Sequence, residues 1–241
     1  MNFAIIAAGE GSRLVAEGVA APKPLVNLDE RPMIRRLADI MVDAGAETIA
    51  IIVNEHMTEV ARYINEVLAV ELPVPVRLVV KTTPDSMHSF YEVARLLGDG
   101  KFILTTVDTI FSPVAFKKYA TAFESDDSLD GFMAVSDYID DEKPLYVAVD
   151  EQMHITGFLD APTPGIKYVS GGIYGLQMPR AAQILDDCMS RGVSRMRNYQ
   201  RALVDAGLRL KAVPLGKIID VDHSSDIVKA RTLIQEFENE R

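Results

Sequence analysis

The alternation of short β-branched segments with helical patterns constrains the fold of this chain more than any other feature. Strands are predicted over residues 3–7, 48–53, 76–80 and 102–107, and helices over residues 33–44, 59–69, 86–97 and 112–123. This order is typical of parallel strands joined by crossover helices. We therefore expect an α/β fold with a doubly wound, mostly parallel sheet and helices on both faces.

The pattern changes in the second half of the chain. Closely spaced strands are predicted over residues 131–135, 146–150, 154–158 and 168–174, followed by helices over residues 180–188 and 195–206. Further strands at 208–213 and 218–221 precede a terminal helix from residue 225. Because no repeat or low-complexity linker separates these parts, we expect one domain whose mixed sheet is extended by antiparallel strands.

Charge and cysteine content limit the partners. The formal net charge is −10 over 241 residues, so a broad basic surface for nucleic acid is not expected. Cys188 is the only cysteine, which excludes an internal disulfide and a cysteine-based zinc cluster and fits a reducing compartment. The N-terminus has no basic leader, and its apolar run is too short to span a bilayer. We expect a cytoplasmic protein with small-molecule partners, away from nucleic acid and membrane.

A glycine-containing loop follows the first predicted strand. It carries the residues Ala7, Ala8, Gly9, Glu10, Gly11, Ser12 and Arg13. Glycines let backbone N–H groups approach phosphate oxygens, although an ordinary strand-to-helix turn is the alternative. Leu14 stands where a dinucleotide-binding loop needs a third glycine, and no Gly-Lys-Ser/Thr step follows as in a P-loop. The spacing therefore excludes both of those commoner phosphate loops.

Lys23 lies between Pro22 and Pro24, whose rings restrict the backbone on both sides of the lysine. A loop lysine is often only a solubilising charge. Together with Arg13, however, Lys23 places two cations beside one glycine loop, which is the charge that a bound triphosphate needs.

These segments together resemble the signature of a known enzyme family. Gly9–Leu14, Pro22–Leu25 and Pro32–Ile34 are similar to motifs of the sugar-phosphate nucleotidyltransferase superfamily. The resemblance implies a Rossmann-like nucleotidyltransferase fold in which the glycine loop wraps around an NTP. It also implies that Arg13 and Lys23 contact the phosphates of that NTP.

The resemblance further implies a single domain over residues 1–241, with an NTP-binding half, an acceptor-binding half and a final metal-binding strand and helix. These parts correspond to residues 1–125, 126–215 and 216–241. The expected reaction transfers a nucleoside monophosphate from an NTP to a phosphorylated small molecule and releases pyrophosphate. The ionised acceptor phosphate itself attacks the NTP, so no nucleophile from the protein is needed. The expected catalytic residues are therefore the charged groups Arg13, Lys23 and Asp108.

Carboxylates at two strand ends are candidate ligands of a magnesium ion, the expected cofactor. Asp108 follows the strand predicted at 102–107 and matches the first metal aspartate of the family, although Val107 replaces the glycine often found there. The second family aspartate corresponds to Asp220 or Asp222. Strand geometry directs both of these to the same face, so both stay open as metal ligands.

The acceptor-binding half departs from the hexose-1-phosphate enzymes of the family. Many of those have a Glu-Lys-Pro step whose lysine holds the sugar phosphate, whereas this chain has Asp160-Ala161-Pro162. The step Ser89-Phe90-Tyr91 looks more like phosphocholine cytidylyltransferases. By contrast, Ser170–Tyr174, with Gly171 and Gly172, resembles the acceptor-binding segment of the sugar enzymes. A sugar-1-phosphate and a phosphocholine-like phosphoalcohol are both candidate acceptors.

Arg197 and Arg201 are candidates for the missing acceptor-binding cation. They lie four residues apart, on one face of a predicted helix, in an otherwise acidic chain. The alternative is a solvated helix face whose arginines pair with nearby acids, and such surfaces are common.

Two other functions are alternatives to nucleotidyl transfer. A glycosyltransferase of related fold would use an Asp-x-Asp step such as Asp220-Val221-Asp222, but that motif normally lies mid-chain rather than near the C-terminus. A catalytically silent homologue that senses a nucleotide sugar would be expected to lose the loop cations or the metal acids. This chain keeps both sets.

Overall fold

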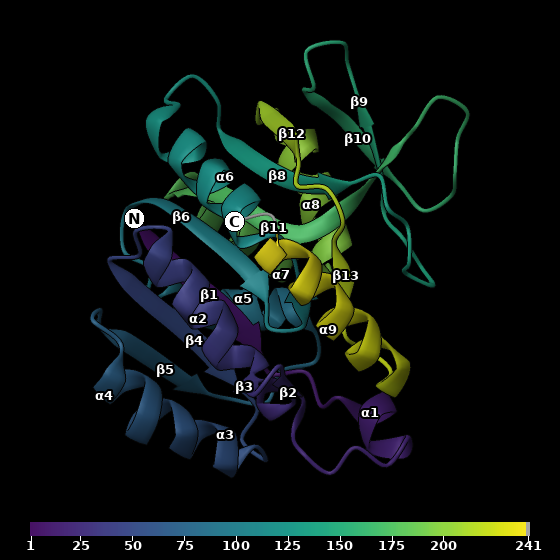
Figure 1. Cartoon of the computed structure of the whole chain (residues 1–241). Coiled ribbons are helices and arrows are strands. Elements are labelled where there is room, and N and C mark those ends of the chain that lie inside the picture. Colours follow the sequence, from purple (N-terminus) through teal and green to yellow (C-terminus); the bar gives the residue numbers. More distant parts are fainter. Residues whose placement is uncertain (240–241) are drawn as a thin grey trace.

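The computed structural model describes residues 1–239, which form an α/β fold around one large sheet (Figure 1). The nine strands of this sheet, within the described residues, are β1 (Asn2–Ala7), β4 (Thr48–Val53), β5 (Val76–Val80), β6 (Gly100–Thr106), β8 (Gly131–Ser136), β9 (Tyr146–Val149), β10 (Ile155–Leu159), β11 (Tyr168–Met178) and β12 (Leu210–Pro214). The order β10-β9-β11-β6-β1-β4-β5 forms the main path, and β8 pairs with both β11 and β12. β6, β1, β4 and β5 are parallel, whereas β11 runs antiparallel to β6 and β8. The predicted mixed sheet with a parallel core is confirmed.

Helices cover both faces of the sheet, as predicted. They are α1 (Ser12–Ala16), the 3₁₀ turn η1 (Lys23–Leu25), α2 (Met33–Asp43), α3 (Thr58–Tyr63), the π-helical turn η2 (Ile64–Leu68), α4 (Ala69–Glu71), α5 (Ser86–Ala94), α6 (Pro113–Ser125), α7 (Arg180–Ser190), α8 (Met196–Asp205) and α9 (Ser224–Asn239). Phe3 and Ile5 of β1 pack with α2, α3 and α6, while Ala4 and Ile6 pack with α5, α7 and α8. Because neighbouring strand residues point to opposite faces, β1 is buried on both sides. None of the helices in residues 1–239 combines the length and apolarity needed to cross a membrane.

The C-terminal helix returns the chain to the glycine loop. In Figure 1, α9 lies near α1, and a third apolar cluster that includes Leu14 and Leu233 joins the two helices. Just before α9, the short strand β13 (Ile219–Asp220) pairs with β7 (Thr109–Ile110), which follows β6. This pairing brings two carboxylate-bearing segments that are far apart in sequence to the same edge of the parallel sheet.

The predicted elements occur in the structure in the expected order, and the differences lie mainly at their ends. The helix expected over residues 59–69 consists of α3, η2 and α4, and the π-helical turn keeps both Ile64 and Leu68 in the core. The strand expected to end at residue 174 continues to Met178 as β11, because its second half pairs with both β6 and β8.

One buried hydroxyl links α6 to two strands of the sheet. The Tyr119 hydroxyl donates to the carbonyl of Phe132 in β8 (2.6 Å) and accepts from the backbone N–H of Gly175 in β11 (2.8 Å). A Cβ added at Gly175 would lie 3.0 Å from that hydroxyl and from the Phe123 ring, so glycine is required there for close packing. The contact fixes the place where the antiparallel strands meet the parallel core.

We predict that Tyr119→Phe lowers the free energy of unfolding by about 1–3 kcal/mol, because two buried backbone groups lose their partner. Urea denaturation measures this change. The matched control is Tyr168→Phe, since the half-buried Tyr168 hydroxyl makes no hydrogen bond among the described residues. Equal, small effects of the two substitutions would contradict the assigned role of Tyr119.

Candidate active site

The glycine loop is shaped around Lys23. Gly11 has φ +63°, in the left-handed region that favours glycine, and it precedes α1. A Cβ added at Gly11 would lie 2.9 Å from the Cβ of Lys23, whereas a Cβ added at Gly9 would meet no atom within 4 Å. Gly11 is therefore required for the loop to pack on Lys23. Gly9 leaves open space above the loop backbone.

Lys23 is a nearly buried cation held by two carboxylates. Its side chain is 9% exposed, and its Nζ lies 2.5 Å from Oδ2 of Asp108 and 2.7 Å from Oδ1 of Asp222. Burial alone would lower the pKa of the Lys23 ammonium, but Asp108 and Asp222 outweigh burial and raise it above its ordinary value. Lys23 therefore stays charged at the point where segments near residues 23, 108 and 222 meet.

The sheet edge positions the two carboxylate segments. Asp108 follows β6, and its carbonyl accepts a hydrogen bond from the N–H of Val221 (3.1 Å). One residue on, Thr109 is the β-partner of Asp220. Oδ2 of Asp226, in the first turn of α9, accepts from the N–H of Asp222 (3.2 Å). These contacts fix the backbone positions of Asp108, Asp220 and Asp222.

Asp220 differs from the other two acids because it makes no ion pair among the described residues. The pKa of the Asp220 carboxyl lies above its ordinary value, because surrounding protein atoms reduce its hydration and nearby Asp108 repels its charge, although the residue is in part exposed to solvent. The Thr109 side chain, through a hydrogen bond, and the Lys23 charge oppose this rise only partly. Because Asp108 and Asp220 repel each other, the place where their carboxylates lie has too little positive charge to balance them.

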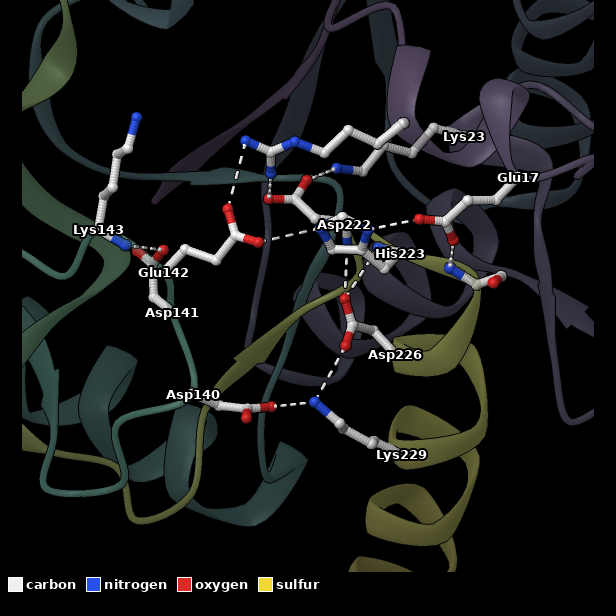
Figure 2. A network of polar contacts seen from close by, with 12 residues as sticks. Glu17, Lys23, Asp140, Asp141, Glu142, Lys143, Asp222, His223, Asp226 and Lys229 are labelled. Atoms are coloured by element: carbon white, nitrogen blue, oxygen red, sulfur yellow. Dashed lines mark hydrogen bonds and ion pairs between the residues drawn. The ribbon is translucent and has the colours of Figure 1, made fainter.

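Arg13 extends the cationic group toward solvent. Its guanidinium lies 3.0 Å from Oδ2 of Asp222, so Asp222 holds both loop cations, and 3.9 Å from Oε2 of Glu142. Figure 2 shows Asp222 and Glu142 on the same network, with Glu142 also facing His223. His223 in turn bonds to Glu17 through Nδ1 (2.6 Å), and the hydrogen bond from His223 lowers the pKa of Glu17 to about 2. The network ties α1 to the start of α9.

A cavity of about 750 Å³ lies over the glycine loop, and we refer to it as the loop cavity. Its walls include the loop, Asp108, residues 83–86 and Ser89 at the start of α5. The Asp85 side chain caps α5 by accepting from the N–H of Met87 (2.8 Å), and the Thr83 and Ser89 hydroxyls lie 2.6 Å apart. The volume falls within the range of about 300–1,000 Å³ that is typical of small-molecule sites.

A second cavity of about 210 Å³, here called the acidic cavity, adjoins the first. Its walls include Gly171 of β11, Asp220 of β13 and the loop that follows β8. Arg13 and Asp222 line both cavities. A molecule in each cavity would therefore meet the other beside Asp222 and its partner Lys23.

The structure brings together most of the residues singled out in the sequence. The loop cavity is lined by Ala8, Gly9, Gly11, Ser12, Arg13, Lys23 and Asp108, as well as by Asp222. Ala7 does not line it, because its side chain packs in the core on the other face of the sheet. Gly172 lines neither cavity, and a Cβ added at Gly172 would lie 3.3 Å from the Thr109 hydroxyl.

Arg197 and Arg201 also line neither cavity, because Asp160 holds both. Nη1 of Arg197 lies 2.7 Å from Oδ1 of Asp160, and Nη2 of Arg201 lies 2.8 Å from Oδ2. These two arginines also lower the pKa of Asp160, with Arg201 contributing more. The pairing is the arrangement expected for a surface role, and a role in acceptor binding stays a prediction.

Sequence reasoning missed three polar groups at the site. Asn54, at the carboxyl end of β4, is 2% exposed and lines the loop cavity, and a search of every parallel strand end would have found it. Ser89 also lines this cavity but was read only as part of a family motif. Glu142 lies in the loop after β8, and no local sequence signal links it to Arg13, which is 129 positions away.

The chain matches one family of known proteins. The model of the family described as "MobA-like NTP transferase domain" matches residues 3–153, more than half of the chain. The chain belongs to this family. The predicted resemblance to sugar-phosphate nucleotidyltransferases is thereby confirmed at the level of the family and of the enzyme class.

Individual relatives of this MobA-like domain have low sequence identity to it. A 2-aminoethylphosphonate cytidylyltransferase from Lancefieldella rimae is 28% identical over 115 residues, which cover 46% of this chain and only 44% of that protein. The structure of an inositol-1-phosphate CTP transferase from T. maritima superposes with a TM-score of 0.80 at 20% identity, covering 98% of this chain and 96% of that one. A UDP-glucose pyrophosphorylase bound to UDP-glucose gives a TM-score of 0.80 at 16% identity, covering 98% of each chain. The two structures share the fold.

The two loop glycines give a matched test of the site geometry. We predict that Gly11→Ala lowers the free energy of unfolding by about 1–2 kcal/mol, because alanine is strained at this φ and its Cβ displaces Lys23. Gly9→Ala should leave stability unchanged, since the position is open and φ there is not positive. Thermal or urea unfolding of the two variants checks this difference. If Gly11→Ala proves as stable as the parent, the described packing of the loop on Lys23 is wrong.

Proposed function

We propose that this MobA-like domain transfers a nucleoside monophosphate from an NTP to a phosphorylated small metabolite and releases pyrophosphate. The observation that carries the proposal is Lys23, a nearly buried ammonium between Asp108 and Asp222, beside the residues that two adjoining cavities share. The loop cavity would hold the NTP and the acidic cavity would hold the acceptor. The reaction would take place where the two cavities meet.

The chemistry that these groups must support is an in-line displacement. An oxygen of the acceptor phosphate attacks the α-phosphorus of the NTP and forms a new P–O bond. The bond from the α-phosphorus to the oxygen that bridges to the β-phosphorus breaks, and pyrophosphate leaves with that electron pair. The acceptor phosphate is already ionised, so no side chain has to remove a proton. The main task of the protein is to neutralise two anions held close together.

Arg13 and Lys23 are the cations suited to that task. In the structure each of them is bound to Asp222, and Lys23 also to Asp108. A phosphate oxygen that approaches either cation competes with these carboxylates for its positive charge. We infer that Asp222 holds the cations in place before the nucleotide binds, and that their charge stabilises the departing pyrophosphate afterwards.

Magnesium is the cofactor that this proposal requires, and Asp108 and Asp220 fit it. They are hard oxygen donors at one sheet edge, and reduced hydration together with the charge of Asp108 raises the pKa of Asp220. Within residues 1–239, no three His, Cys, Asp or Glu side chains form a ready metal site. That suits an ion commonly held by one or two carboxylates together with substrate phosphate oxygens. When bound, the ion would polarise the α-phosphate.

The test is pyrophosphate release, measured with each of the four NTPs and a panel of phosphorylated acceptors, for three matched variants. We predict that Asp108→Asn and Asp220→Asn each lower magnesium-dependent turnover by about 100-fold or more, because each removes a charged ligand at the reacting centre. Asp222→Asn should cause a smaller loss of turnover, because its role is to hold Arg13 and Lys23. The control is Asp43→Asn, an exposed position at the end of α2.

Several results would contradict this account. Near-normal turnover of a folded Asp108→Asn variant at saturating magnesium would remove Asp108 from the site. A larger loss from Asp222→Asn than from Asp220→Asn would exchange the roles given to these two acids. No pyrophosphate release from the parent protein with any NTP and acceptor would reject the proposed transfer itself.

A further inference from the structure

Thr109 lies between the two carboxylates assigned to the metal ion. It follows Asp108 directly in the chain, and it is the antiparallel β-partner of Asp220, where β7 pairs with β13. Residues directly opposite each other in an antiparallel pair place their side chains on the same face and close together. The Thr109 side chain makes a hydrogen bond to Asp220. Since Thr109 is only 1% exposed, little water competes for its hydroxyl.

The Asp220 carboxylate has no other fixed partner in the part of the chain that the structure describes. Asp108 and Asp222 are both held by Lys23, whereas Asp220 forms no ion pair within residues 1–239. Its orientation therefore depends on Thr109 more than on any cation.

A second hydroxyl extends this contact to the loop cavity. Oγ1 of Thr106 lies 2.7 Å from Oγ1 of Thr109, and Thr106, at the end of β6, lines the loop cavity. Each hydroxyl has a single proton to donate. A metal ligand must be ionised, and an ionised Asp220 can only accept, so Thr109 donates to Asp220 and Thr106 donates to Thr109. The hydrogen bonds therefore run in one direction, from the cavity wall to the carboxylate.

A bulge in β11 packs against the two hydroxyls. The pairing of β11 with β8 shifts register between Ser170 and Tyr174, and Gly172 within this interval has φ +71°. A Cβ added at Gly172 would lie 3.3 Å from Oγ1 of Thr109 and 3.7 Å from Oγ1 of Thr106. Bulges are frequent beside active sites. The glycine therefore lets the backbone of β11 approach the pair of hydroxyls closely.

We propose that Thr109 is a positioning residue which, together with Thr106, holds the Asp220 carboxylate in place for a divalent cation. The inference rests on the proposed transferase function and adds two uncharged residues to its metal site. Thr109 acts on the cation only through Asp220. Groups that hydrogen-bond to a metal ligand typically contribute about 10- to 100-fold to metal affinity or activity.

Two substitutions at Thr109 separate the hydroxyl from the shape of the side chain. Valine keeps the shape and removes the hydroxyl, whereas serine keeps the hydroxyl. We expect Thr109→Val to weaken Mn²⁺ binding by roughly 10-fold or more in the presence of a non-hydrolysable NTP analogue, and Thr109→Ser to bind Mn²⁺ nearly as well as the parent. Electron paramagnetic resonance of free Mn²⁺, with the whole chain, measures this affinity without turnover.

Thr105→Val is the matched control. Thr105 is buried in the same strand, but its side chain points to the opposite face of the sheet from Thr106, and its hydroxyl bonds to the carbonyl of Thr106 (3.4 Å). Thr106→Val should weaken Mn²⁺ binding less than Thr109→Val, because Thr109 can still donate to Asp220. Urea unfolding shows that each variant is folded. Equal effects of Thr109→Val and Thr105→Val, or a Thr109→Ser variant as weak as Thr109→Val, would overturn the positioning role.

Asp220→Asn distinguishes failure of this inference from failure of the proposed function. Weaker Mn²⁺ binding by Asp220→Asn but not by Thr109→Val would keep the metal site and overturn the role of Thr109. Mn²⁺ binding that depends on Thr109, without pyrophosphate release from any NTP and acceptor, would support that role and reject the transfer. Unchanged Mn²⁺ binding in both variants would overturn the role of Thr109 together with the assignment of Asp220 to the metal.

Discussion

The contact of the Lys23 ammonium with Asp108 and Asp222 is the interaction on which the site depends. A cation that is 9% exposed is costly to bury unless carboxylates compensate it, and here the two partners come from segments about 85 and 199 positions away. The same contact orders the glycine loop, because Gly11 packs directly on the lysine stem. One ion cluster thus links the glycine loop, the end of β6 and the segment before α9.

The fold supplies this cluster by bringing three chain segments to one edge of the parallel sheet. β1 ends in the glycine loop, β6 ends at Asp108, and the pairing of β7 with β13 places Asp220 beside them. The packing of α9 near α1 closes the arrangement, as Figure 1 shows. Because the carboxyl ends of parallel strands bind ligands in α/β folds, the cluster lies where a nucleotide site is expected.

The sequence was sufficient for the parts of the site that local patterns encode. Strand and helix alternation predicted the parallel core, and the glycine loop, Lys23 and Asp108, which were singled out from their motifs, line one cavity. Pairings between distant side chains left no such pattern. The pairing of Asp160 with Arg197 and Arg201, and the contact of Glu142 with Arg13, depend on how β10, α8 and the loop after β8 pack together. The local periodicity of the sequence carries no information about that packing.

The central claim is that binding of a nucleotide and a divalent cation displaces the contacts between Lys23 and the surrounding carboxylates. The most direct measurement is a crystal structure with a non-hydrolysable NTP analogue and Mn²⁺, whose anomalous signal locates the metal. The account predicts Mn²⁺ on Asp108 and Asp220, with the Lys23 Nζ moved from Asp222 to a phosphate oxygen. A nucleotide bound away from the glycine loop, or Lys23 still held by both Asp108 and Asp222 beside a bound triphosphate, would contradict it.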